Sequence, residues 1–213
     1  FRSVLSLWRA GRFTARAMRR LAAADAFSSM GLSRQQALWE TRLLRDEPLP
    51  LFEKAEEAAG SDDQGLDRLP AVARSRQVIC DYASVGFSLR AHPVCFVREK
   101  LDRMDVHPCA VLKDAAQTPH GKYVAVAGIV LVRQRPGTAK DVTFITLEDE
   151  TAIANLVVWK RVYQRFRREA RARMLIAEGH VQREGDIVHV VVTKMRAIDG
   201  ELAGLEVSSR NFH

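Results

Sequence analysis

The sequence has few cysteines and no long apolar run, and both shortages exclude classes of protein. Its three cysteines, Cys80, Cys95 and Cys109, form no CxxC pair and have no histidine at metal-ligand spacing. This pattern disfavours a disulfide framework and a zinc knuckle, and it favours a reducing, cytoplasmic setting. No apolar run approaches the roughly 18 residues that span a bilayer, and no signal peptide is evident, so we expect no membrane partner.

Charge is distributed unevenly along the 213 residues. Residues 1–45 have nine arginines against two acids, residues 46–121 have nine basic residues against thirteen acidic ones, and residues 122–213 have fifteen against eleven. Basic ends around an acidic middle are expected of a protein that meets a polyanion at two places, although a basic surface alone is weak evidence. The 47% hydrophobic content excludes a mostly disordered chain. Because the chain begins at Phe1 and not at Met, we expect it to be part of a longer protein.

Residues 122–198 show the element order of a small barrel. Apolar and alternating segments predict five strands and, between the third and fourth of them, a basic helix. The predicted strands are 123–133, 142–147, 155–159, 174–181 and 187–195. This order is typical of the oligonucleotide/oligosaccharide-binding (OB) fold, whose usual ligand is single-stranded nucleic acid. We therefore predict an α+β protein in which a helical N-terminal region precedes a five-stranded OB-type β-barrel.

Composition divides the chain into four segments. They are a helical segment (1–46), an acidic linker (47–77), a small helical bridge (78–118) and the OB domain (119–213). In the first segment, a turn at 28–32 joins two predicted helices, and Ser33 is the expected N-cap of the second, with Ala37, Leu38 and Trp39 on its apolar side. The arrangement resembles half of a helix-hairpin-helix DNA clamp, with Ser29 in place of the usual first glycine. A plain helical hairpin is an equal alternative.

Three short motifs admit a functional interpretation beside a structural one. Pro48 to Phe52 resembles a sliding-clamp-binding peptide without its leading Gln, but an apolar anchor for the linker is favoured. His92 invites a catalytic interpretation, yet no Ser, Cys or acid partner is placed beside it, so a histidine that caps or braces the following helix is favoured. Glu148, Asp149 and Glu150 could be mistaken for a metal site, but they fall in the turn after the second strand, where we expect solvated acids.

The loop between the first two strands is the main predicted DNA contact. Arg133, Arg135 and Lys140 flank the turn-forming pair Pro136-Gly137, and Thr138 lies in the same loop. Such a loop can lay several cations along a phosphate backbone while the glycine allows close approach. The hairpin at 182–186, with Gly185 at a position of positive φ, is a weaker candidate for a second contacting edge.

The second strand predicts a stacking platform. Side chains alternate along a strand, so Ile145 and Leu147 suit the barrel interior, which leaves Phe144 and Thr146 on the outer face. An exposed aromatic ring there could stack on any base. Core packing of Phe144 is an equal alternative. Trp159 could extend the platform, although a buried tryptophan that closes the barrel is slightly favoured.

The predicted helix after the third strand is strongly basic. It has one acid, Glu169, an apolar stripe of Val162, Phe166 and Ala170, and seven cations: Lys160, Arg161, Arg165, Arg167, Arg168, Arg171 and Arg173. We expect it to make DNA affinity strongly salt-dependent, or else to dock on an acidic partner protein. Lys194 and Arg196 on the last strand are candidates for backbone contacts. The predicted nucleic-acid-binding residues are Arg133, Arg135, Thr138, Lys140, Phe144, Thr146, Trp159, Arg161, Arg165 and Lys194.

Four runs of sequence resemble one family. They are LAAADAFSSMGLSRQQALWE (21–40), DYASVGFSLRAHP (81–93), VAGIVLVRQRPGTAKDVTFITLEDE (126–150) and SSRNFH (208–213). Together they resemble the C-terminal region of the error-prone bacterial C-family DNA polymerases, the DnaE-like enzymes of damage-induced mutagenesis. Asp141 stands where the family is expected to have Gly, which places an acid beside the proposed DNA loop, and Asn211 stands where Asp is expected.

The resemblance implies a polymerase whose catalytic palm lies upstream of Phe1. The Mg²⁺ ions of nucleotidyl transfer and the aspartates that hold them would belong to that part, so we expect no catalytic residue, metal or cofactor in this chain. The chain would hold template DNA, single-stranded, during translesion synthesis. A competing hypothesis is a docking module for mutasome accessory proteins or the sliding clamp, and the least favoured is a hydrolase that uses His92.

Overall fold

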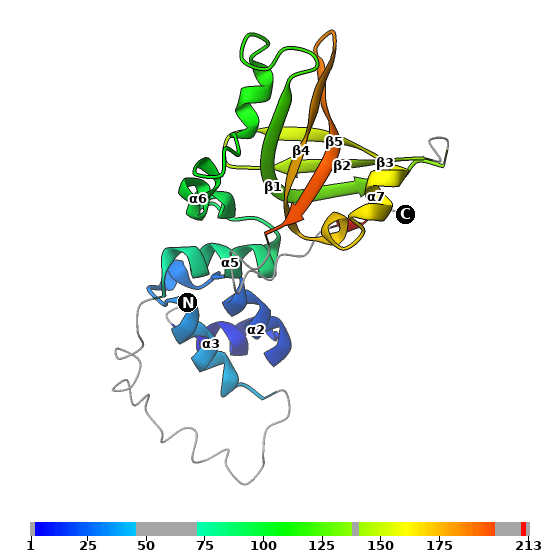
Figure 1. Cartoon of the computed structure of the whole chain (residues 1–213). Coiled ribbons are helices and arrows are strands. Elements are labelled where there is room, and N and C mark those ends of the chain that lie inside the picture. The colour runs from blue at the N-terminus through cyan, green and yellow to red at the C-terminus, as the bar shows by residue number, and fades with distance from the viewer. Residues whose placement is uncertain (1–2, 46–71, 138–140, 199–209, 212–213) are drawn as a thin grey trace, which may run out of the picture. The chain divides into compact units, whose positions relative to one another are not determined.

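The protein is described from a computed structural model that covers residues 3–45, 72–137, 141–198 and 210–211. The chain divides into two compact units, Phe1–Val85 and Gly86–His213 (Figure 1). The division falls inside the segment 78–118 that the sequence suggested as a bridge. The clamp-like peptide Pro48 to Phe52 and most of the predicted linker lie outside the described residues.

The first unit contains helices α1 (Val4–Gly11), α2 (Ala15–Ala23), η1 (Ser28–Met30), α3 (Arg34–Arg42) and α5 (Arg74–Val85). The helical pattern at the start of the sequence contains a break between α1 and α2. Arg12 adopts a left-handed conformation (φ 49°), and the Thr14 hydroxyl accepts the Ala17 N–H as the N-cap of α2. A threonine that bonds its own backbone in this way starts a new helix.

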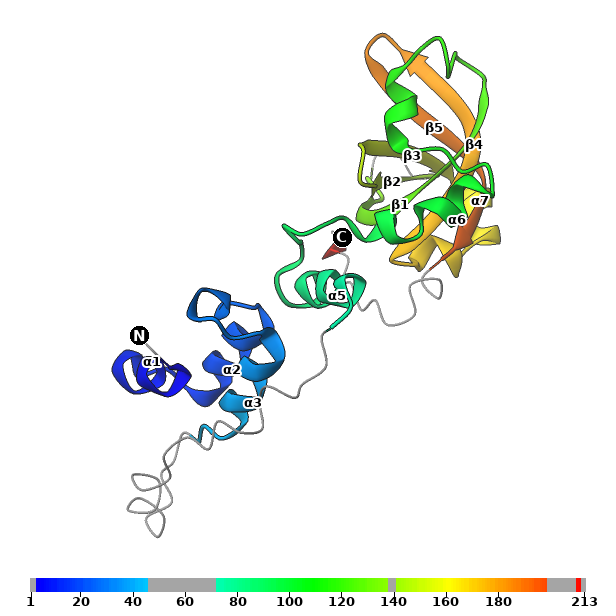
Figure 2. The same cartoon turned by 90° about the vertical axis from the view of Figure 1, so that its left-hand side faces the viewer.

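The hairpin of α2 and α3 forms as predicted. The two helices lie side by side (Figure 2), and Gly31 turns the chain with φ 78°. The Ser33 hydroxyl accepts the Gln36 N–H while the Gln36 side chain accepts the Ser33 N–H, a complete capping box. The assignment of Trp39 to the apolar side is wrong, because this side chain is 54% exposed and lies under the Arg42 guanidinium, 5.9 Å from the ring centroid.

The second unit is a closed barrel of five strands. They are β1 (Tyr123–Gln134), β2 (Val142–Glu148), β3 (Ile153–Trp159), β4 (Met174–Glu184) and β5 (Ile187–Ala197). β1 pairs antiparallel with both β2 and β4, β2 pairs with β3, β4 pairs with β5, and β3 pairs parallel with β5. These pairings close the ring, so the predicted OB topology is confirmed (Figure 1). The short β6 (Arg210–Asn211) adds a parallel pairing to β1.

Alternation along the strands fills the barrel with apolar side chains. Ile145 and Leu147 are buried in the interior cluster, as predicted, with Leu156, Leu175 and Val190 from the neighbouring strands. The opposite side of β1 is covered by η3 (Pro93–Phe96), α6 (Arg98–Asp102) and the following chain, which reaches β1 through the His107 N–H bond to the Ala125 carbonyl (2.8 Å). η4 (Cys109–Lys113) contacts β1 and β3.

Gly179 marks a point where β4 and β5 approach closely. A Cβ on this residue would lie 2.1 Å from the Val191 carbonyl oxygen, and the strand register shifts at this position. We expect Gly179→Ala to destabilise the barrel by roughly 1–3 kcal/mol, because the strands must separate to admit the methyl group. Urea denaturation measures the loss. Gly137→Ala, whose added Cβ meets nothing within 4 Å, is the matched control and should change stability little.

Candidate nucleic-acid interface

The outer surface of β2, β3 and β5 carries a row of half-buried side chains. Phe144 pairs with Val157 across β2 and β3, and Val157 pairs with Val191 across β3 and β5. Residues paired across a sheet point to the same face, so Phe144, Val157 and Val191 form one apolar row outside the barrel. Phe144 does not belong to the interior cluster. The row is a platform against which a flat ring can pack.

A second row beside the first is polar. Thr146 pairs with Asn155, and Asn155 pairs with His189. The Thr146 hydroxyl lies 3.4 Å from the Asn155 side-chain oxygen. Sequence reasoning named Thr146 but missed Val157, Asn155, His189 and Val191, although the same alternation along the third and fifth strands could have indicated them. Together the two rows define the open face of the barrel.

Trp159 stands at the edge of the open face, opposite Val142 of β2. Its side chain is 51% exposed, so the slightly favoured expectation of a buried tryptophan that closes the barrel is wrong. It is also the residue that immediately precedes α7 (Lys160–Arg165). The exposed indole therefore lies between the apolar row and the basic segment.

The arginines at the loop between β1 and β2 differ in role: one is bound to the fold and the other is exposed. The Arg133 guanidinium donates to the carbonyl oxygen of Ala170 (2.7 Å) and to that of Ala172, and so ties β1 to the segment before β4. Arg135 is exposed. Thr138 and Lys140 lie outside the described residues. Within this loop, Arg135 is thus the described cation on the surface, whereas Arg133 braces the fold.

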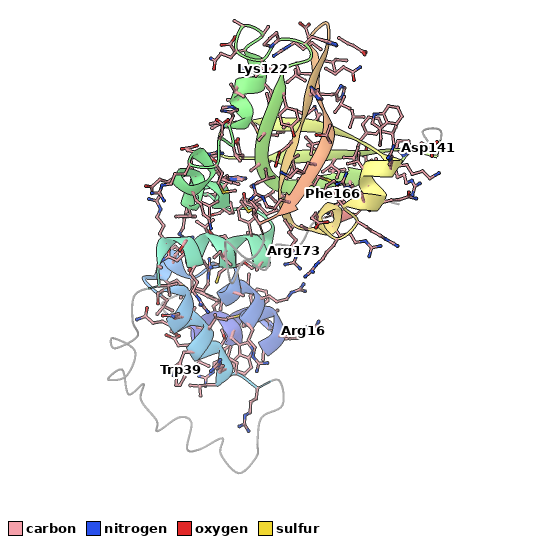
Figure 3. All side chains as sticks on the ribbon, in the orientation of Figure 1. Arg16, Trp39, Lys122, Asp141, Phe166 and Arg173 are labelled. Atoms are coloured by element: carbon pink, nitrogen blue, oxygen red, sulfur yellow. The ribbon has the colours of Figure 1, made fainter. Side chains whose placement is uncertain are left out.

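The helix in the basic segment is shorter than predicted. α7 ends at Arg165, Phe166 leaves helical geometry (φ −111°, ψ 38°), and a 3-10 turn, η5 (Glu169–Arg171), follows. The predicted apolar stripe is present, because Ala170 is buried and Val162 and Phe166 pack against the interior cluster. Packing of the Phe166 side chain holds this segment to the barrel (Figure 3). The single helix expected over 160–173 is therefore wrong, although its inward-facing side chains were identified.

The cations of this segment point outward. All seven predicted members, Lys160, Arg161, Arg165, Arg167, Arg168, Arg171 and Arg173, are exposed. Lys160 pairs with Asp141 (2.9 Å), an ion pair that lowers the pKa of the Asp141 carboxyl (Figure 3). The Asp141 carboxylate thus partly compensates the charge of Lys160. Arg161, Arg167 and Arg168 form no ion pair with any of the described residues.

The far edge of the barrel lies on β4 and β5. Gly185 takes the predicted positive φ of 60° in the connecting turn. Lys194 is exposed and pairs with Glu178 at 3.1 Å, and Arg196 is exposed two residues further along β5. The pairing with Glu178 partly compensates the Lys194 charge, so this edge is less basic than the segment after β3.

The acidic turn after β2 is a structural junction. The Asp149 side chain is buried and accepts hydrogen bonds from the Cys109 N–H (2.7 Å), the Arg98 guanidinium (2.9 Å) and the N–H and hydroxyl of Thr151 (2.8 and 2.6 Å). Burial alone would raise the pKa of Asp149, but hydrogen bonds from Thr151, Cys109 and Ala152 hold it below its ordinary value. The expectation of solvated acids is wrong at this position, because the carboxylate joins the η3–η4 segment to the barrel.

His92 has a structural role. Its Nδ1 accepts the Val94 N–H (3.2 Å) and so caps η3, and its Nε2 lies 3.9 Å from a Glu148 carboxylate oxygen. Burial lowers the pKa of His92 and the nearby Asp149 and Glu150 act against that shift. The hydrogen bond from the Val94 N–H supports the bracing role that the sequence favoured.

The described residues contain neither a metal-binding cluster nor a membrane-spanning helix. Among them, no three His, Cys, Asp or Glu side chains are grouped so that they could hold a metal ion. None of the helices described is long and apolar enough to cross a membrane.

The fold and the open face define the class of this domain. Residues 124–198 match the family model described as an OB-fold nucleic acid binding domain. Among solved structures, the barrel is similar to asparaginyl-tRNA synthetase from Pyrococcus horikoshii in complex with asparaginyl-adenylate, with 26% identity over 45% of this chain and 22% of that chain and a TM-score of 0.38.

The relatives in sequence are more specific and cover most or all of the chain. It is 41% identical to error-prone DNA polymerase 1 of Rhizobium meliloti (strain 1021), over 100% of this chain and 19% of that polymerase. It is 44% identical to the error-prone DNA polymerase of Bradyrhizobium diazoefficiens, over 89% of this chain and 16% of that polymerase. The predicted resemblance to error-prone DNA polymerases is confirmed, and the chain spans about a fifth of the length of the curated relatives it matches.

Proposed function

We propose that this chain is the DNA-holding region of an error-prone polymerase that acts in translesion synthesis and damage-induced mutagenesis. Its open barrel face binds single-stranded template without reading the base sequence. Nucleotidyl transfer and the Mg²⁺ ions that it uses belong to other parts of the polymerase. The observation that carries the proposal is the position of the exposed Trp159 between the Phe144 row and seven outward-facing cations.

Each part of this surface supplies one component of the binding free energy. An aromatic ring packs equally well on every base, which gives tolerance of sequence and of damaged bases. The cations after β3 attract the phosphate backbone by displacing its counterions. The polar row of Thr146, Asn155 and His189 offers hydrogen-bonding groups beside the apolar one, so bases and sugars can both be accommodated.

We expect Phe144→Ala to weaken single-strand binding about tenfold, because the variant loses one stacked base. Titration of labelled dT12 into the purified chain, at 50 and 200 mM salt, measures this loss. The wild-type affinity should fall steeply between the two salt concentrations. Leu43→Ala, which removes a 76% exposed apolar side chain from the first unit, is the matched control and should leave affinity unchanged. The proposal fails if wild-type protein shows no measurable affinity at 50 mM salt.

A second candidate function is protein docking, and exposed apolar side chains favour it. Phe87, Leu89 and Phe96 at the start of the second unit are 56%, 94% and 38% exposed. Such side chains are candidates for contact with a mutasome protein or a sliding clamp. Phe87→Ser together with Leu89→Ser should abolish partner recruitment while dT12 affinity stays constant. Loss of dT12 affinity in this variant would argue against two separate surfaces.

A further inference from the structure

The apolar row on the open face continues beyond β5. Val191 of β5 pairs with His180 of β4, and His180 pairs with Tyr123 of β1. The row therefore runs from Phe144 through Val157, Val191 and His180 to Tyr123 on one continuous outer surface. Four strand spacings of about 4.8 Å make the path roughly 19 Å long. For bases stacked at the duplex rise of about 3.4 Å per nucleotide, this length corresponds to about five or six nucleotides.

The row ends in an aromatic pair with a fixed geometry. Tyr123 and His180 pack edge to face, with ring centroids 5.1 Å apart. The Tyr123 hydroxyl lies 3.2 Å from a Glu178 carboxylate oxygen, and His180 Nδ1 lies 3.1 Å from the Gly121 carbonyl oxygen. Tyr123 nevertheless remains 48% exposed. An exposed ring that is already held in position loses little conformational entropy when a base stacks on it.

A pocket of about 340 Å³ opens beside this pair, between the outer side of β1, β4 and β5 and the chain after α6. Its lining includes Tyr123, Glu178, Lys194, Arg196 and His107. Its volume is at the lower end of the range for small-molecule sites, which suits one nucleotide better than a peptide.

The charges in the pocket leave one cation available for an anion. Glu178 is bound to Lys194 (3.1 Å), and Asp105 lies 3.8 Å from His107. Arg196 forms no ion pair within the described part of the chain. A guanidinium binds a phosphate with two parallel hydrogen bonds. The pocket thus combines a base platform, Tyr123, with a phosphate ligand, Arg196.

We propose that the Tyr123–Arg196 pocket is a terminal nucleotide subsite, in which the single strand that crosses the open face places one further base on Tyr123 and its phosphate on Arg196. This inference rests on the proposed function and extends it. It assigns the binding track two ends, one at the basic segment after β3 and the other at this pocket. It also makes affinity depend on oligonucleotide length in a way that the open face alone does not.

The test compares two lengths, dT4 and dT12, by fluorescence anisotropy with the full 213-residue chain. We expect dT4 to bind entirely on the platform of β2 and β3, whereas dT12 is long enough to reach the pocket as well. Tyr123→Ala combined with Arg196→Ala should weaken dT12 binding at least about fivefold and dT4 binding less than about twofold. Phe144→Ala should weaken both. Tyr123→Phe, which keeps the ring, and Lys113→Ala, which removes an exposed cation outside the pocket, are the controls and should resemble wild type.

Two results separate the inference from the proposed function. Wild-type protein that binds neither oligonucleotide overturns both. If Phe144→Ala weakens binding but the Tyr123–Arg196 variant binds dT12 as wild type does, the pocket is not part of the track and the inference alone is wrong. Photo-crosslinking of wild-type protein to a dT12 that carries 5-iododeoxyuridine gives an independent readout that requires no variant to fold. The crosslinked peptide should contain Tyr123, and crosslinks confined to β2 and β3 would overturn the inference.

Discussion

Asp149→Ala is expected to destabilise the barrel unit by about 2–4 kcal/mol, because it removes a buried carboxylate that accepts several hydrogen bonds and one of the carboxylates paired with Arg98, which keeps its contact with Glu150 (2.5 Å). The Asp149 side chain is fully buried, and that of Arg98 is 16% exposed. The substitution also removes the acceptor of the Cys109, Thr151 and Ala152 N–H groups. Buried donors without acceptors add to the loss. Urea denaturation monitored by far-UV circular dichroism measures it.

A neighbouring carboxylate provides the control for this experiment. Asp102 also faces Arg98, at 4.0 Å, but its side chain is 57% exposed. An exposed ion pair contributes about 1 kcal/mol or less, so Asp102→Asn should be nearly neutral. Equal losses in the two variants would show that Asp149 is not the junction between the η3–η4 segment and the barrel.

The same carboxylate predicts a pH dependence. Because the folded protein lowers the pKa of Asp149, its contribution to stability is present above about pH 4 and is lost as the pH falls through the lowered value. As the pH falls from about 5 to about 2.5, Asp149→Asn should therefore lose less folding stability than the wild-type protein does. Parallel pH profiles of the two proteins would count against this origin of the acid sensitivity.

Removal of three cations from the basic segment should have the largest effect on binding. Arg161, Arg165 and Arg168 are exposed, and each phosphate contact on a single strand contributes about 0.7 to the slope of log affinity against log salt. The triple alanine variant should therefore reduce the slope by about 2 and weaken dT12 binding about a hundredfold at 0.1 M salt. Anisotropy titrations at four salt concentrations give both quantities.

A charge-matched triple variant tests whether position matters or only net charge. Arg90→Ala, Arg103→Ala and Lys113→Ala remove three exposed cations from the same unit, outside the segment after β3. This variant should keep the wild-type slope within about 0.5, less than one phosphate contact. Equal slopes in the two triple variants would mean that the segment is not a phosphate-binding surface, and would favour its alternative role as a docking face for an acidic protein.

The barrel was predictable because its signals are local. Alternation placed Ile145 and Leu147 inside and Phe144 outside, and short loops with turn residues fixed the order of the strands. These patterns depend on chain geometry within a few residues. The capping box at Ser33 likewise depends on only four consecutive residues. Such features follow from the sequence without knowledge of distant contacts.

The incorrect predictions concern residues whose environment depends on contacts that are distant in sequence. Asp149 looks like a solvated turn residue until Arg98 and Cys109, about forty to fifty positions earlier, pack around it. The interior contact of Phe166 accompanies the end of a helix that composition alone would extend. Trp39 is apolar by type but exposed, whereas Phe27, Met18 and Ala37 fill the core of its unit. In each case tertiary packing decides the outcome, and local patterns cannot reveal it.

The order in which the strands pair determines when, during synthesis on the ribosome, the barrel can fold. β1 must wait for β4, and β3 must wait for β5, so the ring stays open until Ala197 has been synthesised. A message truncated in the turn near Gly185 would yield β3 and β4 with unsatisfied edges, which are templates for aggregation. The nascent chain therefore gains its barrel in one late step.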